Sequence, residues 1–147
     1  VLDNSQMLVS GDMTVGYQPA STGNVVRLSG RNPLLRTDSL NIRNGAVLEF
    51  EVPKEGYAEV PIQCTAASGG SSNLTLQAAN VWVKVSGREF QQAGGGWVVL
   101  ATNLNKTMSG SISLANCDLP EGSTLVSGAQ YIAVRLPSTG GTVLRLY

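Results

Sequence analysis

The sequence of 147 residues contains no histidine and only two cysteines, Cys64 and Cys117. Without histidine, the chain cannot assemble a Ser-His-Asp or Cys-His catalytic arrangement. The cysteines form no CxxC pair, so neither the spacing nor the ligand types of a zinc site are present. The two cysteines either join in a disulfide in an oxidising compartment or remain buried free thiols, and we favour the free thiols.

Charge is also scarce. Charged residues make up 14% of the chain, below the roughly 25% of ordinary soluble domains. The 10 basic and 10 acidic residues cancel, and no basic patch is visible, so we expect no nucleic-acid partner. No apolar run approaches the ~20 residues of a membrane helix, so we expect no membrane insertion by this chain.

The sequence also lacks the motifs that hold common cofactors. There is no P-loop, and no GxGxxG follows an expected strand. The glycines at positions 94–96 are interpreted as a loop, not as a phosphate cradle. We therefore expect no cofactor, no metal site and no catalytic residues.

With few charges, the polar surface must be built from Ser, Thr, Asn and Gln. That composition is typical of secreted and cell-surface β proteins. The chain opens at Val1 with neither an initiator Met nor a signal peptide. We expect it to be a piece of a longer secreted protein whose targeting signal has been removed, located outside the cell or on its surface.

What the sequence does contain is period-2 alternation, the pattern of β-strands. In residues 47–52, for example, Leu48 and Phe50 share one face, and Glu49 and Glu51 share the other. Glycine, asparagine and proline residues separate such runs and supply the turns between strands. No helical stripe of apolar residues is sustained anywhere, so the sequence predicts an all-β fold.

Two short phrases recur in the first third of the chain. Residues 7–11 are echoed by residues 26–30, and residues 13–16 are echoed by residues 40–43. Recurrence of strand-plus-corner units indicates a coiled, stacked architecture. We predict a single β domain over residues 1–147, with repetitive coils in 1–52 and less regular coils and a cap in 53–147.

These phrases, with others further along the chain, carry a resemblance to a known family. The matching segments are residues 8–11, 13–16, 23–26, 28–30, 39–42, 44–48, 97–100, 109–112 and 119–125. They resemble the C-terminal coils of bacterial autotransporter-type passenger domains and of exported proteins that carry autotransporter-associated strand repeats. The resemblance implies a right-handed parallel β-helix, a solenoid, with a less regular C-terminal capping region. An antiparallel β-sandwich or jelly roll is the alternative.

The resemblance also implies which side chains point into the solenoid. The expected inward positions are Leu8, Val15, Val26, Leu28, Leu40, Ile42, Leu48 and Phe50. Asn44, before Gly45, would suit a tight corner because Asn tolerates the left-handed conformation. The family has no shared active site, so none is carried over to this chain.

Two carboxylates are the first candidate ligand residues. Glu49 and Glu51 lie two positions apart on one strand face, roughly 7 Å from each other. Such a pair could hold calcium or act on a polysaccharide. The simpler interpretation, which we favour, is a pair of charges on the polar face, with Arg27 or Arg43 on a neighbouring coil as partner.

Trp82 is the second candidate, predicted to point outward between inward-facing valines. Together with Tyr57 or Tyr131 it could form a sugar-stacking platform. The alternative, which we favour, is that the loop at residues 86–96 covers it. Trp97 begins an apolar run and is expected in the core.

We therefore expect a non-catalytic structural or adhesive module, the C-terminal fragment of a larger exported β-helical protein. The alternatives are a carbohydrate-binding module and a non-catalytic fragment of a polysaccharide-acting enzyme. A host or cell-surface glycan or protein is the expected partner, and the oligomeric state is left open. The sequons at Asn73 and Asn105 would accept glycans in a eukaryotic secretory pathway and are chance matches in a bacterial protein.

Overall fold

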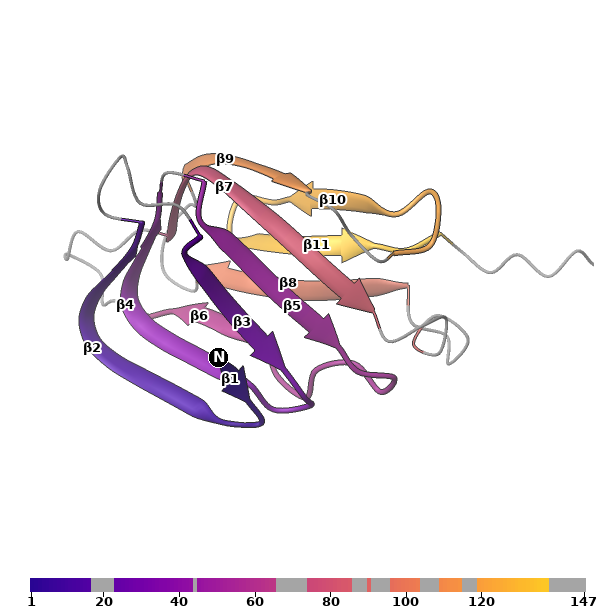
Figure 1. Ribbon diagram of the computed structural model, residues 1–147, viewed down its shortest axis with the longest axis horizontal. Helices are drawn as coiled ribbons and strands as arrows, with labels where there is room; N and C mark the ends of the chain where they lie inside the picture. The colour runs from indigo at the N-terminus through magenta and orange to yellow at the C-terminus, as the bar shows by residue number, and fades with distance from the viewer. Residues whose placement is uncertain are drawn as a thin grey trace, which may run out of the picture.

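The fold is all-β, as the alternation predicts (Figure 1). The computed structural model describes residues 1–16, 23–43, 45–65, 74–85, 90, 96–103, 109–114 and 119–137, with only the backbone described in 74–85 and 109–114. The strands are β1 (Leu2–Asp3), β2 (Gln6–Val15), β3 (Val25–Ser29), β4 (Leu34–Ile42), β5 (Val47–Val52), β6 (Ile62–Cys64), β7 (Leu74–Val85), β8 (Trp97–Asn103), β9 (Ser109–Leu114), β10 (Thr124–Ser127) and β11 (Tyr131–Arg135). In this part of the chain no helix has the length and apolar character needed to span a membrane.

The strands belong to one hydrogen-bonded sheet that folds over itself. Its main path runs β1-β3-β5-β7-β4-β6-β8-β11-β10, with β2 paired to β4 and β9 paired to β7. Figure 1 shows β3, β5 and β7 as a front layer, with β6, β8 and β11 behind it. Eight of the ten described strand pairings are parallel, and only β8–β11 and β10–β11 are antiparallel.

The sheet is therefore mixed, and it is not the regular solenoid that the resemblance implies. The reason lies in the final strands. The turn between β10 and β11 is tight, with the Gly128 amide donating to the Tyr131 carbonyl at 2.9 Å. A connection this short can only join antiparallel strands, and β11 then runs antiparallel to β8 as well. The alternative, an antiparallel sandwich, does not describe the structure either, because most pairings are parallel.

One of the two sequence echoes corresponds to the observed strand register. Met13 pairs with Leu40, and Val15 pairs with Ile42, so residues 13–16 lie directly beside their echo. The other echo does not stack. Residues 7–11 lie in β2 beside β4, whereas Leu28 of the echoing segment lies in β3 between Leu2 and Phe50.

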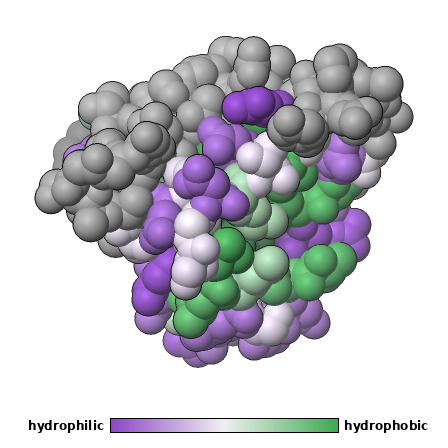
Figure 2. Space-filling model, turned by 90° about the vertical axis from the view of Figure 1, so that its left-hand side faces the viewer, coloured by the Kyte–Doolittle hydropathy of each residue, from purple (hydrophilic) through white to green (hydrophobic). Residues whose placement is uncertain are grey.

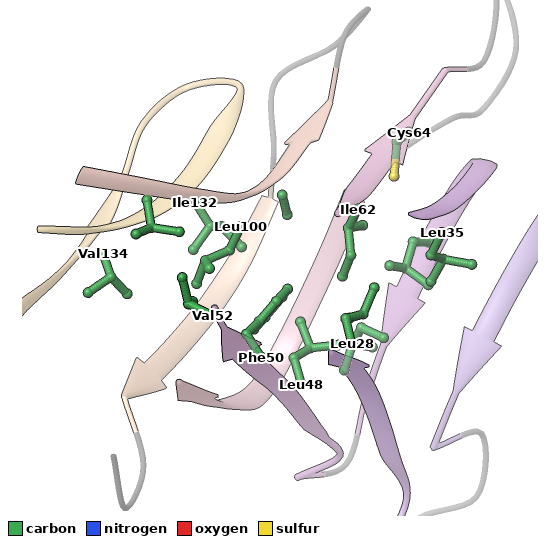
Figure 3. Packing of buried hydrophobic residues seen from close by; sticks show 14 of the residues in the cluster. Leu28, Leu35, Leu48, Phe50, Val52, Ile62, Cys64, Leu100, Ile132 and Val134 are labelled. Carbon is green, nitrogen blue, oxygen red and sulfur yellow. The ribbon is translucent and has the colours of Figure 1, made fainter. Parts of the chain in front are cut away.

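A single aliphatic cluster fills the space between the layers. Figure 3 shows Leu48 and Phe50 of β5 packed toward Ile62 and Leu100 on the strands opposite. Of the predicted inward positions, Leu28, Leu40, Ile42, Leu48 and Phe50 are fully buried, and Val15 and Val26 are partly buried against the cluster. At about 25 cal/mol per Å² of apolar surface, this burial is the main stabilising contribution to the fold.

The prediction for Leu8 is wrong. Its side chain is 65% exposed, and its register partner is Arg36, which is also exposed. Met7, not Leu8, stands beside the fully buried Leu35, although Met7 itself is 43% exposed. A one-residue displacement reverses the face of every side chain in a strand, which is why the assignment failed here.

Candidate functional site

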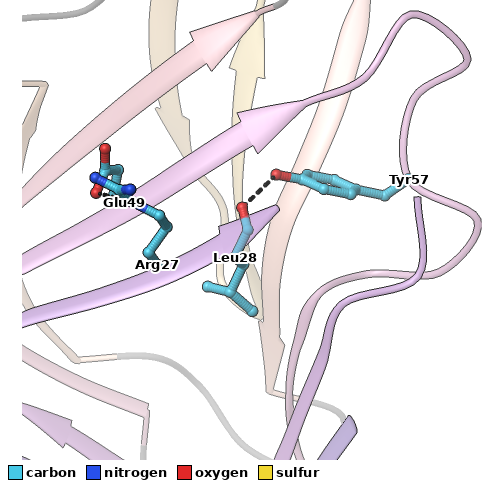
Figure 4. Close-up of polar contacts among 4 residues, drawn as sticks. All are labelled: Arg27, Leu28, Glu49 and Tyr57. Carbon is cyan, nitrogen blue, oxygen red and sulfur yellow. Dashed lines mark hydrogen bonds and ion pairs between the residues drawn. The ribbon is translucent and has the colours of Figure 1, made fainter. Parts of the chain in front are cut away.

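The carboxylate candidate Glu49 is engaged in an ion pair. Arg27 of β3 and Glu49 of β5 are register partners, so both side chains stand on the same face of the sheet. The Arg27 Nε lies 2.6 Å from the Glu49 Oε2 (Figure 4). This hydrogen bond and the charge of Glu49 raise the pKa of Arg27. Of the two partners that the sequence suggested, the structure selects Arg27, and Glu49 serves as its counter-ion.

Glu51 shares the strand face of Glu49 but does not join it in a metal site. It is half-buried and pairs in register with Lys84 of β7. The charge of Glu51 contributes to the raised pKa values of Arg27 and Tyr57. Within the described residues, no three acidic or cysteine side chains group together as metal ligands would. Glu51 therefore adds negative charge near Arg27, beside the ion pair that Arg27 makes with Glu49.

Trp82 lies in β7 and is the register partner of Glu49. Its side chain and most of the 86–96 loop lie outside the described residues, so its predicted outward orientation is not tested. Tyr57 is one of the two neighbours expected for Trp82. Its hydroxyl donates a hydrogen bond to the Leu28 carbonyl at 3.3 Å (Figure 4). Burial raises the pKa of Tyr57 and keeps its hydroxyl neutral.

The exposed aromatic residue of the described surface is Trp97, and the expectation that it lies in the core is wrong. It is the first residue of β8 and is 45% exposed. Burial alternates along this strand, with Val98 and Leu100 inward and Trp97 outward. The signal was present in the sequence, since the period-2 rule that places Val98 inside places Trp97 outside. Tyr131 of β11, the other expected neighbour of Trp82, meets Trp97 edge-on with ring centroids 6.0 Å apart.

Trp97 stands at the border of a shallow groove with a volume of about 350 Å³. The loop between β5 and β6 forms the opposite wall and contributes two exposed carboxylates, Glu55 and Glu59. Phe90 and Tyr57 also line the groove. The site therefore combines aromatic surface with carboxylates, a composition suited to binding.

Backbone hydrogen bonds hold this wall in place. The Gly56 amide donates to the Pro53 carbonyl at 2.9 Å, and the Ala58 amide donates to the Arg31 carbonyl at the same distance. Gly56 has a φ of +73°, and a Cβ at this position would lie 2.9 Å from the Phe90 ring. Glycine is thus required both by the backbone conformation and by the close approach of Phe90.

Cys64 is a free thiol in the structure, and its side chain is fully buried. Burial raises its pKa to about 11, against a smaller opposing effect of a hydrogen bond with the Leu40 backbone. A buried thiol of raised pKa is unreactive at neutral pH. The expectation of a free, buried cysteine is therefore met at Cys64, whereas Cys117 lies outside the described residues, as do Asn44, Asn73 and Asn105.

Comparisons with known proteins give no relative: no family model, no curated protein and no solved structure matches the chain. The resemblance to autotransporter-type coils stays a prediction made from the quoted segments. The candidate site must accordingly be interpreted from its own geometry. That geometry consists of a charge-balanced sheet face at Arg27 and Glu49 and an aromatic groove at Trp97.

Proposed function

We propose that the chain is a non-catalytic structural module of an exported or cell-surface protein, in which it ends a stack of parallel β-strands. The observation that carries the proposal is the difference between the two ends of the sheet system. Among the described strands, the side formed by β1 and β2 has unpaired edges, and the side formed by β10 and β11 ends in a hairpin.

The open side exposes both backbone and apolar side chains. Among the described strands, β2 pairs only with β4, which leaves one edge of a ten-residue strand unpaired. The exposed large aliphatic residues gather on or beside β1, β2 and β3: Val1, Met7, Leu8 and Val25. Figure 2 shows apolar surface among hydrophilic residues on the face that β2 forms. Long apolar edges of this kind attract further strands.

Rows of side chains that follow one another in register across neighbouring strands also end at this side. Met7, Leu35 and Ile62 follow one another in register across β2, β4 and β6. Leu35 and Ile62 are fully buried, but Met7 is 43% exposed, since no described strand pairs with the other edge of β2. One more parallel layer would bury Met7 and extend the row. The proposed parent architecture is the predicted right-handed parallel β-helix, with this chain as its last coils and cap.

The hairpin of β10 and β11 supports the capping role. It lies antiparallel against β8 and buries Ile132 and Val134 in the cluster. A stack that ended on a parallel strand would offer its edge to other chains, and a short antiparallel hairpin ends the stack with a smaller edge.

The remaining support is compositional and chemical. The low charge of 14% suits an exported β protein, and the chain has no histidine for acid–base work at neutral pH. The best-placed buried carboxylate, Glu49, is neutralised by Arg27. In the proposed role the backbone ladders and aliphatic core provide stiffness, and the outer faces meet a glycan or protein partner.

The proposal is tested by adding a layer. Leu2 pairs with Leu28, so a copy of residues 1–26 placed before Val1 would set the copied Leu2 in register with Leu2 and bring the copied β2 beside β2. We expect the extended chain to melt several degrees higher, because nearest-neighbour interfaces add stability in stacked proteins. We also expect slower hydrogen exchange at the β2 amides.

The matched control carries lysine at the copied Met7, Met13 and Val15, the side chains that would face the core. It should show neither the gain in melting temperature nor the protection of β2. If the two extended chains behave alike, or if β2 gains no protection in either, the open edge does not accept a parallel layer and the proposal fails.

A further inference from the structure

Two hollows border the start of β8. The first is the groove of about 350 Å³ that Trp97 lines together with Glu55 and Glu59. The second has a volume of about 530 Å³ and is lined by Gly96 and Arg135 among others. Gly96 and Trp97 are consecutive, so a ligand lying across the start of β8 would reach both hollows. This arrangement favours an elongated ligand over a compact one.

The indole of Trp97 is well placed to receive a flat, partly apolar face. It is 45% exposed, and Tyr131 supports it edge-on at an interplanar angle of 63°. A tryptophan exposed at the border of a groove leaves a large apolar surface in water unless a ligand covers it. The other exposed large apolar side chains of the described residues lie on or beside β1, β2 and β3, so Trp97 is separate from that apolar edge.

The polar groups around Trp97 include both hydrogen-bond acceptors and hydrogen-bond donors. Glu55 and Glu59 are hydrogen-bond acceptors on one side, and Arg135, the cross-strand partner of Trp97, is a donor on the other. All three side chains are exposed, and none has a hydrogen bond or an ion pair with another described residue. The Tyr57 hydroxyl is already used by the Leu28 carbonyl.

We propose that Trp97 is the stacking platform of a site for a neutral oligosaccharide, with Glu55 and Glu59 accepting and Arg135 donating hydrogen bonds to sugar hydroxyls. A pyranose ring presents an apolar face of C–H groups that matches an indole, and each hydroxyl both donates and accepts. A polyanion attracted by Arg135 would be repelled by the two glutamates, and a polycation attracted by the glutamates would be repelled by Arg135. The mixed charges therefore favour an uncharged ligand.

This inference is independent of the proposed structural role, because the site lies on β8 and the β5–β6 loop and not on the β1–β2 edge. It also differs from the platform expected at Trp82. Either proposal can fail while the other stands.

The test uses six oligosaccharides of six units each. Four are neutral: cellohexaose, chitin hexaose, mannohexaose and xylohexaose. Two are charged: chitosan hexaose and hexagalacturonate. Binding is measured by calorimetry on the unmodified chain and by fluorescence in a Trp82→Phe background, in which Trp97 is the remaining tryptophan. We expect at least one neutral hexaose to bind and to change the Trp97 emission, and both charged ones to bind at least tenfold more weakly.

Substitutions then locate the site. Trp97→Ala should weaken binding at least about tenfold, and Trp97→Tyr should retain part of the affinity because it keeps an aromatic face. Glu55→Gln together with Glu59→Gln should weaken binding about fivefold. Asp3→Asn removes an exposed carboxylate from β1, which lines neither hollow, and should leave affinity unchanged.

Binding that survives Trp97→Ala would place the sugar elsewhere and overturn the proposal. Tighter binding of chitosan hexaose or hexagalacturonate than of every neutral hexaose would overturn the inference of an uncharged ligand. If none of the four neutral hexaoses bound measurably, the proposal of an oligosaccharide site at Trp97 would be rejected. Melting curves of each variant guard against loss of fold, and the exposed position of Trp97 predicts little change in stability.

Discussion

Arg27 and Glu49 form an unequal pair: the Arg27 side chain is 46% exposed, whereas the Glu49 side chain is only 11% exposed. The two are joined at 2.6 Å across neighbouring parallel strands. An exposed arginine loses little when its partner is removed, because water solvates it. A buried carboxylate that loses its counter-ion keeps its desolvation cost without compensation. The two residues should therefore respond differently to substitution.

Replacing Arg27 by methionine should lower the melting temperature by roughly 2–5 °C, because Glu49 is left charged and unpaired. Replacing Glu49 by glutamine should cost less, since the neutral amide needs no counter-ion. The double variant should recover at least half of the loss caused by Arg27→Met. Thermal unfolding followed by circular dichroism measures all three.

Arg36→Met supplies the control, because Arg36 is exposed and bonds to the neutral Gln63 at 2.8 Å. Its melting temperature should change by less than about 1 °C. If Arg27→Met and Glu49→Gln were simply additive in the double variant, the two residues would not be energetically coupled.

Local patterns in the sequence predicted the strands and most of the inward side chains of this fold. They predicted less well which distant strands pair with one another. The alternation correctly placed Leu48 and Phe50 inward. The register of this strand is strongly determined, because a shift of one residue would turn both side chains out of the core. In β2 the assignment failed at Leu8, although burial alternates without a break from Leu8 to Val15. Leu8 and Val15 are seven positions apart and therefore stand on opposite faces, so strict alternation from the inward Val15 would have placed Leu8 outward.

The site was less predictable than the core. Glu49 was recognised because charge on an alternating strand stands out, and its partner Arg27 follows from the register of β3 and β5. The groove at Trp97 depends on the β5–β6 loop folding against β8, which brings Glu55 and Glu59 near a residue far along the chain. No local pattern encodes such a contact. The antiparallel pairing of β11 with β8 was missed for the same reason, because it also joins segments far apart in the chain.

The contrast between an inward and an outward leucine gives a direct test of the core. Leu40 is fully buried in the cluster, and Leu8 is 65% exposed. Leu40→Ala should lower the free energy of unfolding by about 3 kcal/mol, and Leu8→Ala should change it by less than about 0.5 kcal/mol. Urea unfolding measures both free energies.

Aspartate at the same two positions gives a stronger test. Leu40→Asp should unfold the chain, because the charge would be buried without a partner, whereas Leu8→Asp should not. Similar losses of stability at the two sites would contradict the assignment of faces.

Two glycines with the same left-handed backbone should differ in their tolerance of alanine. Gly16 has a φ of +78° and Gly45 a φ of +69°, so alanine is strained at both, by about 1 kcal/mol. A Cβ at Gly16 would also clash with the carbonyl oxygen of Arg43, whereas a Cβ at Gly45 meets open space. Gly16→Ala should therefore cost at least about 2 kcal/mol more than Gly45→Ala in chemical denaturation. Equal costs would show that the approach of Arg43 to Gly16 is not as close as the structure has it.

The buried thiol of Cys64 predicts how stability depends on pH at the alkaline end. The pKa of Cys64 rises from 9.0 to about 11 in the folded chain, mainly because of burial. Between these values the unfolded chain has lost the thiol proton and the folded chain has kept it, so the folded state binds more protons. Stability is then complete below pH 9 and falls as the pH rises toward 11, by an amount of the order of 2 kcal/mol. Tyr57, whose pKa is also raised by burial, adds a loss of the same sign at higher pH.

Removing the thiol should remove its part of this dependence. In a Cys117→Ser background, which leaves one cysteine, Cys64→Ala should lower stability at pH 7 because a cavity forms, yet its stability should decline less between pH 9 and 11. The same background should leave Cys64 unreactive toward a thiol reagent at pH 8 until denaturant is added, because the side chain is fully buried. Parallel pH profiles with and without Cys64, or rapid labelling of the native chain, would mean that water reaches the sulfur and that the cluster does not enclose Cys64.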